Sequence, residues 1–397
     1  MDRDFDVIVF GSTGFTGRLV AEHLLKVYGC AGAVKWAMAG RDQPKLEAVR
    51  REIGAPASLP LVIADSSDPA SLTAMARRTK AITTTAGPYQ LYGSGLVTAC
   101  AAEGTDYVDI AGEPNWTYDM LAHEAVAKAS GARIVFCCGF DSIPFDLGVH
   151  FLQQTARTRF GATAPRVRGR IRRLERGVGG GQSGGSRATG MAVMAAVQAN
   201  PQIMSVLADP FALTPGFKGP NQPDGTKSHE DPVTGSWVAP FVGAAMDTKI
   251  VHRSNFLMGH PWGKEFAYDE MSLMDGPAGN VVGASSFYLV DGKPPKPGEG
   301  PSRSEREGGC YDILFIGEAA DGRTLRASVT GDMDPGAGST SRMLGESAVC
   351  LARDISRDVT PGGMWTSASA MGDTLIKRLQ ANAGMAFRIE DQNSHAP

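Results

Sequence analysis

The sequence predicts an α/β protein in which an N-terminal doubly wound parallel sheet is followed by a smaller α+β part and by C-terminal helices. Strand-like and helix-like patterns alternate through residues 1–150, as a doubly wound sheet requires. From about residue 151 this alternation stops, and helical patterns with apolar stripes return after residue 338. We therefore expect a first domain over 1–150, a second α+β domain for substrate binding or dimerisation over 151–338, and a C-terminal helical segment, 339–397, that packs on the first domain.

An apolar run at residues 7–10 predicts the first strand, and apolar residues spaced by four and three positions predict the helix that follows. Between them lies a turn with glycine at every third position: Gly11, Ser12, Thr13, Gly14, Phe15, Thr16 and Gly17. In a Rossmann-type dinucleotide site the first glycine makes the tight turn, the second lets the backbone approach the pyrophosphate, and the third lets helix and strand pack closely. We assign residues 11–17 to cofactor binding, with Gly11, Gly14 and Gly17 in these three roles. A plain strand-to-helix turn would show the same spacing.

The second strand is expected over residues 34–39 and ends at Gly40-Arg41, where an NAD enzyme would place an acidic residue against the ribose hydroxyls. A guanidinium group at this position pairs instead with the 2'-phosphate of NADP. Arg41 therefore predicts NADP as the cofactor. The competing interpretation is a solvated surface arginine, with Asp42 capping the next helix.

The third and fourth strands are expected over residues 59–64 and 80–86, and they end at Asp65 and at Gly87-Pro88. Open parallel sheets bind ligands beyond the carboxyl ends of their strands, at the point where the strand order reverses. Asp65, Gly87 and Pro88 are therefore assigned to cofactor binding. Tyr89, the next residue, is the candidate catalytic residue, and a structural role for its side chain stays open.

Two more strands are expected over residues 107–110 and 133–138, and each leaves polar residues beyond its carboxyl end. Glu113 follows the first strand, whereas Asp141 and Ser142 follow the second. The carboxyl ends of parallel strands meet at one edge of a sheet, so these side chains are expected on the same side as Tyr89.

The second part begins with a basic strand-like stretch at 167–174, a glycine-rich loop at 177–185 and an apolar helix at 189–198. The loop suits phosphate binding, a lid over substrate, or a plain flexible connection. Two proline- and glycine-rich stretches, 210–240 and 291–301, are expected to be long surface loops. The remaining predicted elements are strands over 266–274, 311–317 and 324–330, the last two joined as a hairpin through Asp321-Gly322, and helices over 341–354 and 367–383.

Charge and cysteine content argue against several classes of protein. Lys and Arg total 39 against 42 for Asp and Glu, a formal net charge of −3, so no global basic field favours nucleic acid. The six cysteines show neither a C-x-x-C pair nor metal-ligand spacing with histidine, which predicts reduced thiols and no metal site. The N-terminus lacks a signal-peptide pattern and no run of 18 apolar residues occurs, so we expect a cytoplasmic protein without a transmembrane segment.

The chain resembles the saccharopine dehydrogenase-like oxidoreductases, and among them it looks most like the mycobacterial trans-acting enoyl reductases. The stretches that carry this resemblance are 11–17, 39–41, 86–89, 109–113, 138–144, 297–302 and 343–348. The resemblance implies a Rossmann domain that binds a nicotinamide cofactor, an α+β domain that covers the active site, and C-terminal helices that return to the first domain. Relatives often have an aromatic residue in place of Ala337, so any family contact made by that ring is lost here.

The resemblance implies, as a first hypothesis, an NADPH-dependent enoyl reductase that acts on acyl or polyketide thioesters of lipid biosynthesis, carried on coenzyme A or on a carrier protein. Such a reaction needs a hydride donor, a hydrogen-bond donor to the carbonyl oxygen and a proton source. Tyr89, Tyr92, Asp141 and Ser142 are the candidates for the last two roles.

Two other hypotheses stay open. An imine or amino-acid reductase like saccharopine reductase would need arginines for substrate carboxylates, for which the candidates are Arg168, Arg170, Arg172, Arg173 and Arg187. A non-catalytic cofactor- or lipid-associated protein could rest the apolar helix around residues 191–197 on a membrane, although core packing explains such a stripe more often. The sequence leaves open the acyl chain length, the proton donor and whether the protein forms a homodimer.

Overall fold

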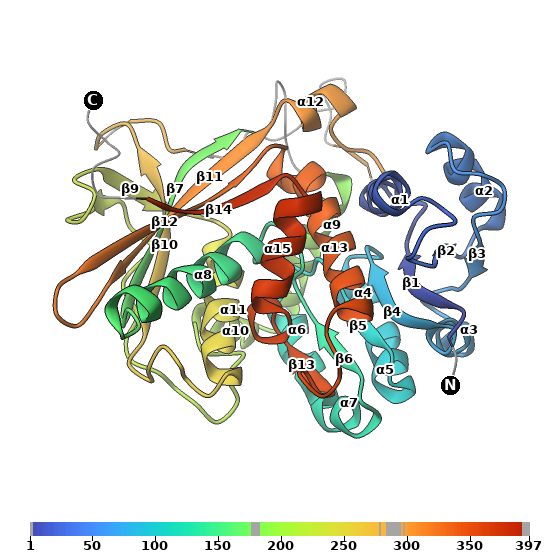
Figure 1. Ribbon diagram of the computed structural model, residues 1–397, viewed down its shortest axis with the longest axis horizontal. Coiled ribbons are helices and arrows are strands. Elements are labelled where there is room, and N and C mark those ends of the chain that lie inside the picture. Colours follow the sequence, from blue (N-terminus) through green and yellow to red (C-terminus); the bar gives the residue numbers. More distant parts are fainter. Residues whose placement is uncertain (1–2, 176–182, 278, 283–294, 297, 391–397) are drawn as a thin grey trace.

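The computed structural model describes residues 3–175, 183–277, 279–282, 295–296 and 298–390. These residues form two seven-stranded sheets with helices packed between and around them (Figure 1). Most of the predicted glycine-rich loop, residues 177–182, lies outside the described residues. The same holds for residues 291–294 and 297 of the predicted loop at 291–301.

All seven strands of the first sheet run parallel, in the order β13-β6-β5-β4-β1-β2-β3. Its strands are β1 (Phe5–Phe10), β2 (Trp36–Gly40), β3 (Leu61–Ile63), β4 (Thr79–Thr84), β5 (Asp106–Val108), β6 (Arg133–Val135) and β13 (Gly363–Trp365). The strand order reverses between β1 and β4, so their carboxyl ends border the crevice where such sheets bind ligands. The predicted doubly wound sheet is confirmed.

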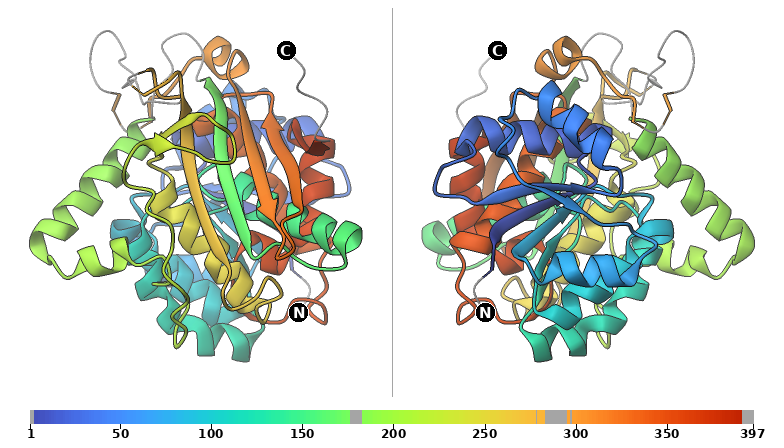
Figure 2. Two further views of the ribbon diagram at one scale, coloured as in Figure 1. Left: turned by 90° about the vertical axis from the view of Figure 1, so that its left-hand side faces the viewer. Right: turned by 90° about the vertical axis from the view of Figure 1, so that its right-hand side faces the viewer.

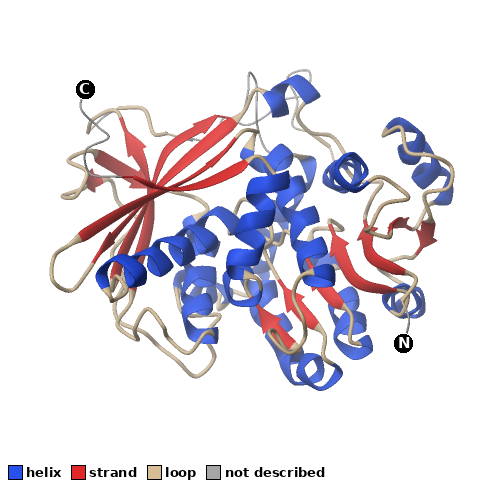
Figure 3. Cartoon of the chain, in the orientation of Figure 1, coloured by secondary structure: helices blue, strands red, loops and turns tan. Residues whose placement is uncertain are grey.

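Helices cover both faces of the first sheet because its strands are apolar on both sides (Figure 3). On β1, Val7 and Val9 face one apolar cluster, whereas Ile8 and Phe10 face the other. The helices on the valine side are α1 (Phe15–Tyr28), α2 (Gln43–Glu52) and α13 (Thr340–Arg353), and those on the other side are α3 (Pro69–Ala76), α5 (Ser94–Glu103) and α7 (Glu124–Ser130). Two short helices, α4 (Tyr89–Tyr92) and α6 (Pro114–Met120), follow β4 and β5.

The second sheet is mixed, with the order β14-β12-β11-β7-β10-β9-β8. Only β7 and β10 pair in parallel, and the other neighbours pair antiparallel. Its strands are β7 (Arg166–Glu175), β8 (His229–Glu230), β9 (Trp237–Pro240), β10 (Ala267–Met274), β11 (Cys310–Glu318), β12 (Thr324–Gly331) and β14 (Met385–Glu390). Helices α8 (Ile143–Phe160) and α11 (Ala244–Leu257) pack on this sheet, and the predicted hairpin between β11 and β12 is present.

The C-terminal segment is only partly the helical segment that the sequence predicted. Helix α13 packs on α1, where the His23 Nε2 atom lies 2.8 Å from Glu346 Oε1. However, the chain then adds β13 to the edge of the first sheet and β14 to the edge of the second. The predicted helix over 367–383 is interrupted after α14 (Ser367–Ala370), because Gly372 adopts a φ of 42° before α15 (Gly372–Asn382) continues. Each edge strand gains its hydrogen bonds from a neighbour distant in sequence, which a local helical pattern does not reveal.

Two further differences concern the second part. The stretch 210–240, predicted to be a surface loop, contains β8 and β9. Helix α11 was not predicted, because residues 246–255 are buried almost without interruption and include Asp247, Lys249 and Arg253, which hide its apolar period. The other helical elements of this part are α9 (Gly184–Ala199), α10 (Ile203–Ala208), α12 (Arg303–Glu307) and the π-helical turn η2 (Pro335–Ser339).

Candidate functional site

The glycine turn after β1 has three glycines with three different environments. Gly11 has a φ of 87°, and a Cβ atom on it would lie 2.9 Å from Thr85 Oγ1. A Cβ atom on Gly17 would lie 2.2 Å from the Gly11 carbonyl oxygen, so helix and turn touch there. A Cβ atom on Gly14 would meet only that same oxygen within 4 Å, at 3.2 Å. The first glycine therefore makes the turn, the third permits close packing, and the second has a single close neighbour, the Gly11 carbonyl oxygen.

The N-terminus of α1 differs from those of the next two helices. Helix α2 is capped by Asp42, which accepts a hydrogen bond from Lys45 N at 3.0 Å, and α3 is capped in the same way by Asp68. Gly14, at the corresponding position of α1, offers no side-chain cap, and the first turn of α1 contains no acidic residue. The first N–H groups of α1 are therefore suited to an anion such as a pyrophosphate.

The other residues of the turn divide into structural and exposed side chains. The Ser12 hydroxyl is buried and donates to the Val9 carbonyl oxygen at 2.6 Å, so it stabilises the turn. Phe15 is buried beside Ala337 of η2. Thr13 is exposed and Thr16 is half-buried. The small Ala337 of η2 therefore packs against the glycine turn through Phe15.

Arg41 and Asp65 lie at the carboxyl ends of β2 and β3, next to the glycine turn in the strand order. The Arg41 side chain is exposed. The Asp65 carboxylate accepts hydrogen bonds from the Ser67 backbone N–H and hydroxyl, and these bonds, with the nearby Arg41 charge, lower the pKa of Asp65. Arg41 thus lies exposed at the end of β2, and its contact with a 2'-phosphate stays an untested prediction.

Tyr89 begins α4, immediately after the exposed Gly87 and the buried Pro88. Its side chain is 3% exposed, and burial raises the pKa of its hydroxyl well above the ordinary value. The hydroxyl donates to the Thr84 carbonyl oxygen at 2.9 Å and accepts a hydrogen bond from Ile110 N at 3.3 Å. Tyr89 therefore ties the end of β4 to the end of β5, and a catalytic role stays an untested prediction.

Glu113 is a site residue whose role the sequence did not reveal. Its carboxylate is fully buried and accepts hydrogen bonds from Tyr89 N at 2.7 Å and from Gln90 N at 2.8 Å. The Thr189 hydroxyl of α9 lies 3.5 Å from the same carboxylate. Burial raises the pKa of Glu113, while the N–H donors oppose this shift. Glu113 therefore holds the turn after β4 and connects it to the second part of the chain.

Asp141 and Ser142 follow β6 and meet acidic residues of the second part. Ser142 Oγ lies 3.5 Å from Asp247 Oδ1 in the first turn of α11. Asp247 is fully buried, and Glu270 of β10 is its acidic neighbour. The structure thus brings Asp141 and Ser142 to the junction of the two parts, at the strand-end edge where the sequence placed them.

The arginines proposed for substrate carboxylates are largely engaged inside the second sheet. Four of the five candidates form ion pairs there: Arg168 with Glu318, Arg170 with Asp231 and Asp269, Arg172 with Asp312 and Glu390, and Arg173 with Glu175. Arg187 in α9 is exposed. Four of the five arginines that an amino-acid reductase could use to bind substrate carboxylates are therefore already paired with acidic side chains.

Helices α9 and α10 form an arm that projects from the body of the molecule (Figure 2). The arm is apolar in composition, yet Gly184 is the only buried residue of α9, and none of the described residues of α10 is buried. Met191, Met194 and Met204 are each more than half exposed, at 60%, 62% and 52%. The arm starts at the site, because Thr189 in α9 contacts Glu113.

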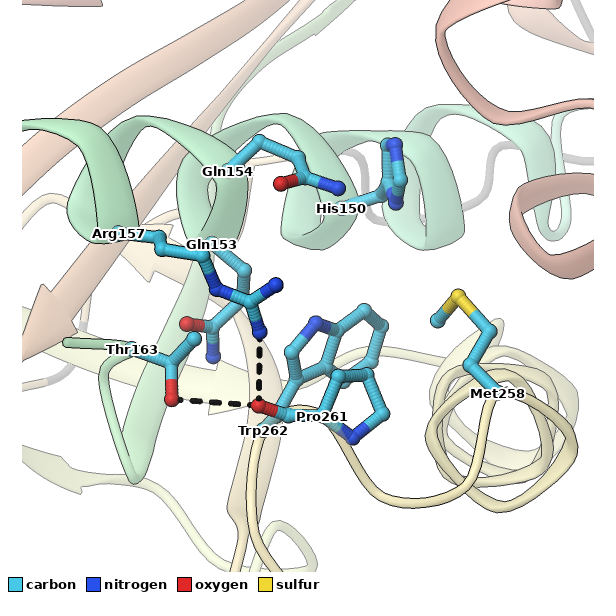
Figure 4. Close-up of a pocket in the computed structure, with 8 residues that line it drawn as sticks. All are labelled: His150, Gln153, Gln154, Arg157, Thr163, Met258, Pro261 and Trp262. Atoms are coloured by element: carbon cyan, nitrogen blue, oxygen red, sulfur yellow. Dashed lines mark hydrogen bonds between the residues drawn. The ribbon is translucent and has the colours of Figure 1, made fainter.

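A pocket of about 210 Å³ lies elsewhere, between α8 and the segment that follows α11 (Figure 4). It is lined by His150, Gln153, Gln154, Arg157, Thr163, Met258, Pro261 and Trp262. The guanidinium group of Arg157 in this lining donates a hydrogen bond to the Pro261 carbonyl oxygen at 3.3 Å. The lining contains none of the residues predicted to bind the cofactor, so we do not assign the dinucleotide to this pocket.

Within the described ranges, no group of three or more His, Cys, Asp or Glu side chains is arranged to hold a metal ion. In the same part of the chain, no helix has the length and apolar character needed to cross a membrane. All six cysteines are free thiols.

Comparisons with known proteins agree with this geometry. Residues 7–135 match the family model described as the saccharopine dehydrogenase NADP binding domain, and this range includes the glycine turn, Arg41 and Tyr89. The cofactor is therefore NADP, as the sequence predicted. Across its full length the chain is similar to saccharopine dehydrogenase (L-Glu forming) from Saccharomyces cerevisiae, with a TM-score of 0.51 and 13% identity over 98% of this chain and 100% of that chain, which shows a shared fold.

Two mycobacterial relatives cover almost the whole chain. A Mycobacterium tuberculosis protein that is provisionally named a trans-acting enoyl reductase is 38% identical over 418 aligned residues, covering 97% of each chain. The trans-acting enoyl reductase of Mycobacterium ulcerans is 36% identical over 408 aligned residues, covering 95% of this chain and 96% of the relative. The chain is therefore an NAD(P)-dependent oxidoreductase, and it belongs to the family of trans-acting enoyl reductases among the saccharopine dehydrogenase-like proteins.

Proposed function

We propose that the protein is an NADPH-dependent reductase of enoyl thioesters, acting on acyl or polyketide intermediates of lipid biosynthesis. The family sets the reaction class, and one observation supports an acyl substrate: the apolar arm of α9 and α10 begins at the turn after β4. A long hydrocarbon chain can lie along such an exposed apolar surface. An amino-acid substrate would instead need cations, and four of the five candidate arginines are engaged by acidic side chains.

The residues of the first sheet hold the cofactor in this proposal. The N–H groups at the start of α1 bind the pyrophosphate beside Gly14, and the exposed Arg41 pairs with the 2'-phosphate. Asp65 lies beside Arg41, and the Gly87-Pro88 turn borders the nicotinamide end of the crevice. The bound dinucleotide supplies a hydride for the carbon β to the thioester carbonyl. Glu113 keeps the turn rigid through its two backbone N–H bonds.

The substrate arrives from another protein in this proposal, so the acyl group is delivered on a carrier protein or on coenzyme A. The protein works in the cytoplasm, where soluble NADPH meets such intermediates. A homodimer is not required, because the glycine turn, Arg41 and the turn after β4 all come from one chain.

NADPH oxidation by the purified protein tests this function. A series of 2-enoyl coenzyme A thioesters of increasing chain length is compared with a mixture of an amino acid and a 2-oxo acid. We expect oxidation only with the thioesters, and we expect KM to fall by up to roughly fourfold per added methylene, because burial of one CH₂ contributes about 0.8 kcal/mol. Met194→Gln should weaken this dependence on chain length, and Met194→Leu is the matched control that keeps the surface apolar.

The other outcomes separate the alternatives. Oxidation with the amino acid and 2-oxo acid, and none with thioesters, would support an imine reductase. Tight NADPH binding without oxidation by either class would support a non-catalytic protein, and in that case lipid vesicles provide the test of whether the arm binds apolar surfaces.

A further inference from the structure

A pair of buried carboxyl groups lies where the end of β6 meets the second part of the chain. Asp247 comes from the first turn of α11 and Glu270 from β10, and the two residues are 0% and 1% exposed. On the side of the first sheet they face Ser142, which is also buried, and next to it Asp141, which is exposed. The pair is thus enclosed by protein, next to the buried Ser142, and the exposed Asp141 is the neighbour of Ser142 in the chain.

Two of the four carboxyl oxygens of the pair receive no hydrogen bond from the described residues. Glu270 Oε2 accepts from the Tyr268 hydroxyl at 2.7 Å, and Asp247 Oδ1 lies 3.5 Å from Ser142 Oγ. The remaining oxygens, Asp247 Oδ2 and Glu270 Oε1, are buried and receive no hydrogen bond. Two neighbouring carboxylates in this state would both be desolvated and would repel each other. A single proton held between them supplies the missing donor and removes the repulsion.

Among the described residues, the groups that act most strongly on the pair include no cation. The titratable groups that face it are Asp141, Asp269, Tyr268 and Cys137. Asp269 is engaged by Arg166 and Arg170. Burial and the neighbouring carboxyl charges therefore raise the pKa of Glu270 to about 8, and they raise the pKa of Asp247 well above its ordinary value.

We propose that the Asp247–Glu270 pair holds the proton that completes the reduction and delivers it to the substrate through the Ser142 hydroxyl. This inference rests on the proposed enoyl reductase function. When a hydride adds to the β carbon, the electron pair of the C=C bond moves onto the thioester as an enolate. The enolate α carbon takes the proton of Ser142 Oγ, and the Asp247 carboxyl proton replaces it on that oxygen. The pair is left with two negative charges and takes its next proton from water beside Asp141.

In this scheme Ser142 is the catalytic residue, whereas Asp247 and Glu270 act through it. The buried Ser142 hydroxyl lies between the pair and Asp141, because it donates to the Asp141 carbonyl oxygen and lies 3.5 Å from Asp247 Oδ1. The paired carboxyls set the pH at which the proton is present. A merely structural pair would stabilise the junction of the two parts without affecting the pH dependence of turnover.

The first test needs neither substrate nor cofactor. Carboxyl groups of the cofactor-free protein, labelled with ¹³C at Asp and Glu side chains, are titrated by NMR. We expect one signal that stays protonated at neutral pH to disappear in Glu270→Gln and to persist in Asp373→Asn. Asp373 is a matched control, since it is an acidic side chain on α15 that is 65% exposed. Asp109, whose pKa burial raises to about 7, gives a separate signal that both variants keep. The absence of any Glu270-dependent carboxyl signal that stays protonated at neutral pH would overturn the proposal.

The second test uses turnover with NADPH and an enoyl thioester. Wild-type kcat should fall as the pH rises through about 8, because the pair must be protonated. Glu270→Gln removes the neighbouring charge that holds the proton on Asp247, so this fall should move to lower pH by at least about one unit. The Gln amide can donate to Asp247 Oδ2, which keeps the variant folded. Ser142→Ala should lower kcat by about 10²-fold and leave the carboxyl titration unchanged, and Ser142→Thr should restore part of the rate.

The failures of the two proposals are distinguishable. A wild-type protein that reduces no thioester, while its carboxyl titration is as expected, refutes the proposed function. A wild-type protein that is active, together with a Glu270→Gln variant of unchanged pH profile or a Ser142→Ala variant of unchanged kcat, refutes the proton delivery.

Discussion

The glycine turn follows β1 of the first sheet, the Asp247–Glu270 pair lies against Ser142 beyond β6, and the two regions are built in opposite ways. The turn is made of seven consecutive residues, and its binding groups are backbone N–H groups that no side chain caps. The pair is assembled from α11 and β10, and Ser142 is 105 positions away from Asp247. The turn attracts negative charge, because its helix start is positive and carries no acidic residue, whereas the pair concentrates acidic groups in a buried place.

This difference explains how each region works. An anion can enter and leave a site made of exposed N–H groups, which is what a dissociating cofactor requires. A proton is retained at neutral pH only where a carboxyl is hidden from water and close to another carboxyl. The two regions therefore divide the reaction between them, with the cofactor phosphates at one end and the proton source at the other.

The largest expected effect distinguishes two glycines within the turn. Gly17→Val places Cβ 2.2 Å from the Gly11 carbonyl oxygen, so we expect a loss of about 3 kcal/mol or more in the free energy of unfolding. Gly14→Val places Cβ 3.2 Å from the same oxygen, a tight contact that a small shift relieves, and Gly14 has the extended backbone that valine prefers. The protein should therefore stay folded but lose NADPH affinity by about 100-fold or more. Urea unfolding and calorimetric titration measure the two effects.

The control for both variants is Gly190→Ala, in α9. A Cβ atom there has no neighbour within 4 Å, and the substitution should raise stability slightly, by up to about 1 kcal/mol. If Gly14→Val bound NADPH as tightly as wild type, the pyrophosphate would have to be placed elsewhere. If Gly17→Val were as stable as wild type, the close contact of helix and turn would not matter for the fold.

The next effect concerns the buried pair and its pH dependence. The pKa of Glu270 is raised to about 8, so the native protein keeps a proton that the unfolded chain, with a Glu pKa of about 4.3, has lost. The free energy of unfolding should therefore fall as the pH rises from about 5 to 8 and level off above, by up to a few kcal/mol. Glu270→Gln should flatten this dependence. Urea unfolding at several pH values measures it, and an equally steep fall in the variant would assign it to other groups.

The sequence predicts the first region well because its determinants are local. Apolar patterns locate β1 to β6 of the first sheet, although not the edge strand β13, and the glycine spacing locates the turn after β1. The second region depends on distant contacts. Charged residues inside α11 mask its helical period, and β14 forms only because β12 offers it an edge. Likewise, Glu113 was identified as a polar residue after β5, but its hydrogen bonds to Tyr89 N and Gln90 N depend on how β4 and β5 pair.

Substitution of Arg41 tests the predicted contact with the 2'-phosphate of the cofactor. A charge-assisted contact with the 2'-phosphate contributes about 1.5 to 3 kcal/mol, which is a preference of roughly 10- to 150-fold for NADPH over NADH. Arg41→Ala should weaken NADPH binding by that factor and leave NADH binding almost unchanged. Arg51→Ala, in the exposed last turn of α2, is a control that should change neither affinity. Equal losses for both cofactors with Arg41→Ala would argue against the phosphate contact.

The smallest expected effect concerns Tyr89, which lies between the two regions. Its hydroxyl is engaged by the Thr84 carbonyl oxygen and by Ile110 N, so Tyr89→Phe should cost about 1 kcal/mol in the free energy of unfolding. We expect kcat to fall less than tenfold and NADPH affinity to be kept, because the ring still packs on Trp116, with 5.4 Å between the ring centroids. Steady-state kinetics and urea unfolding of the variant provide both numbers. A fall in kcat of about 10²-fold without a loss of stability would instead make the Tyr89 hydroxyl a direct participant in the reaction, and Ser142 would then not be the sole proton donor.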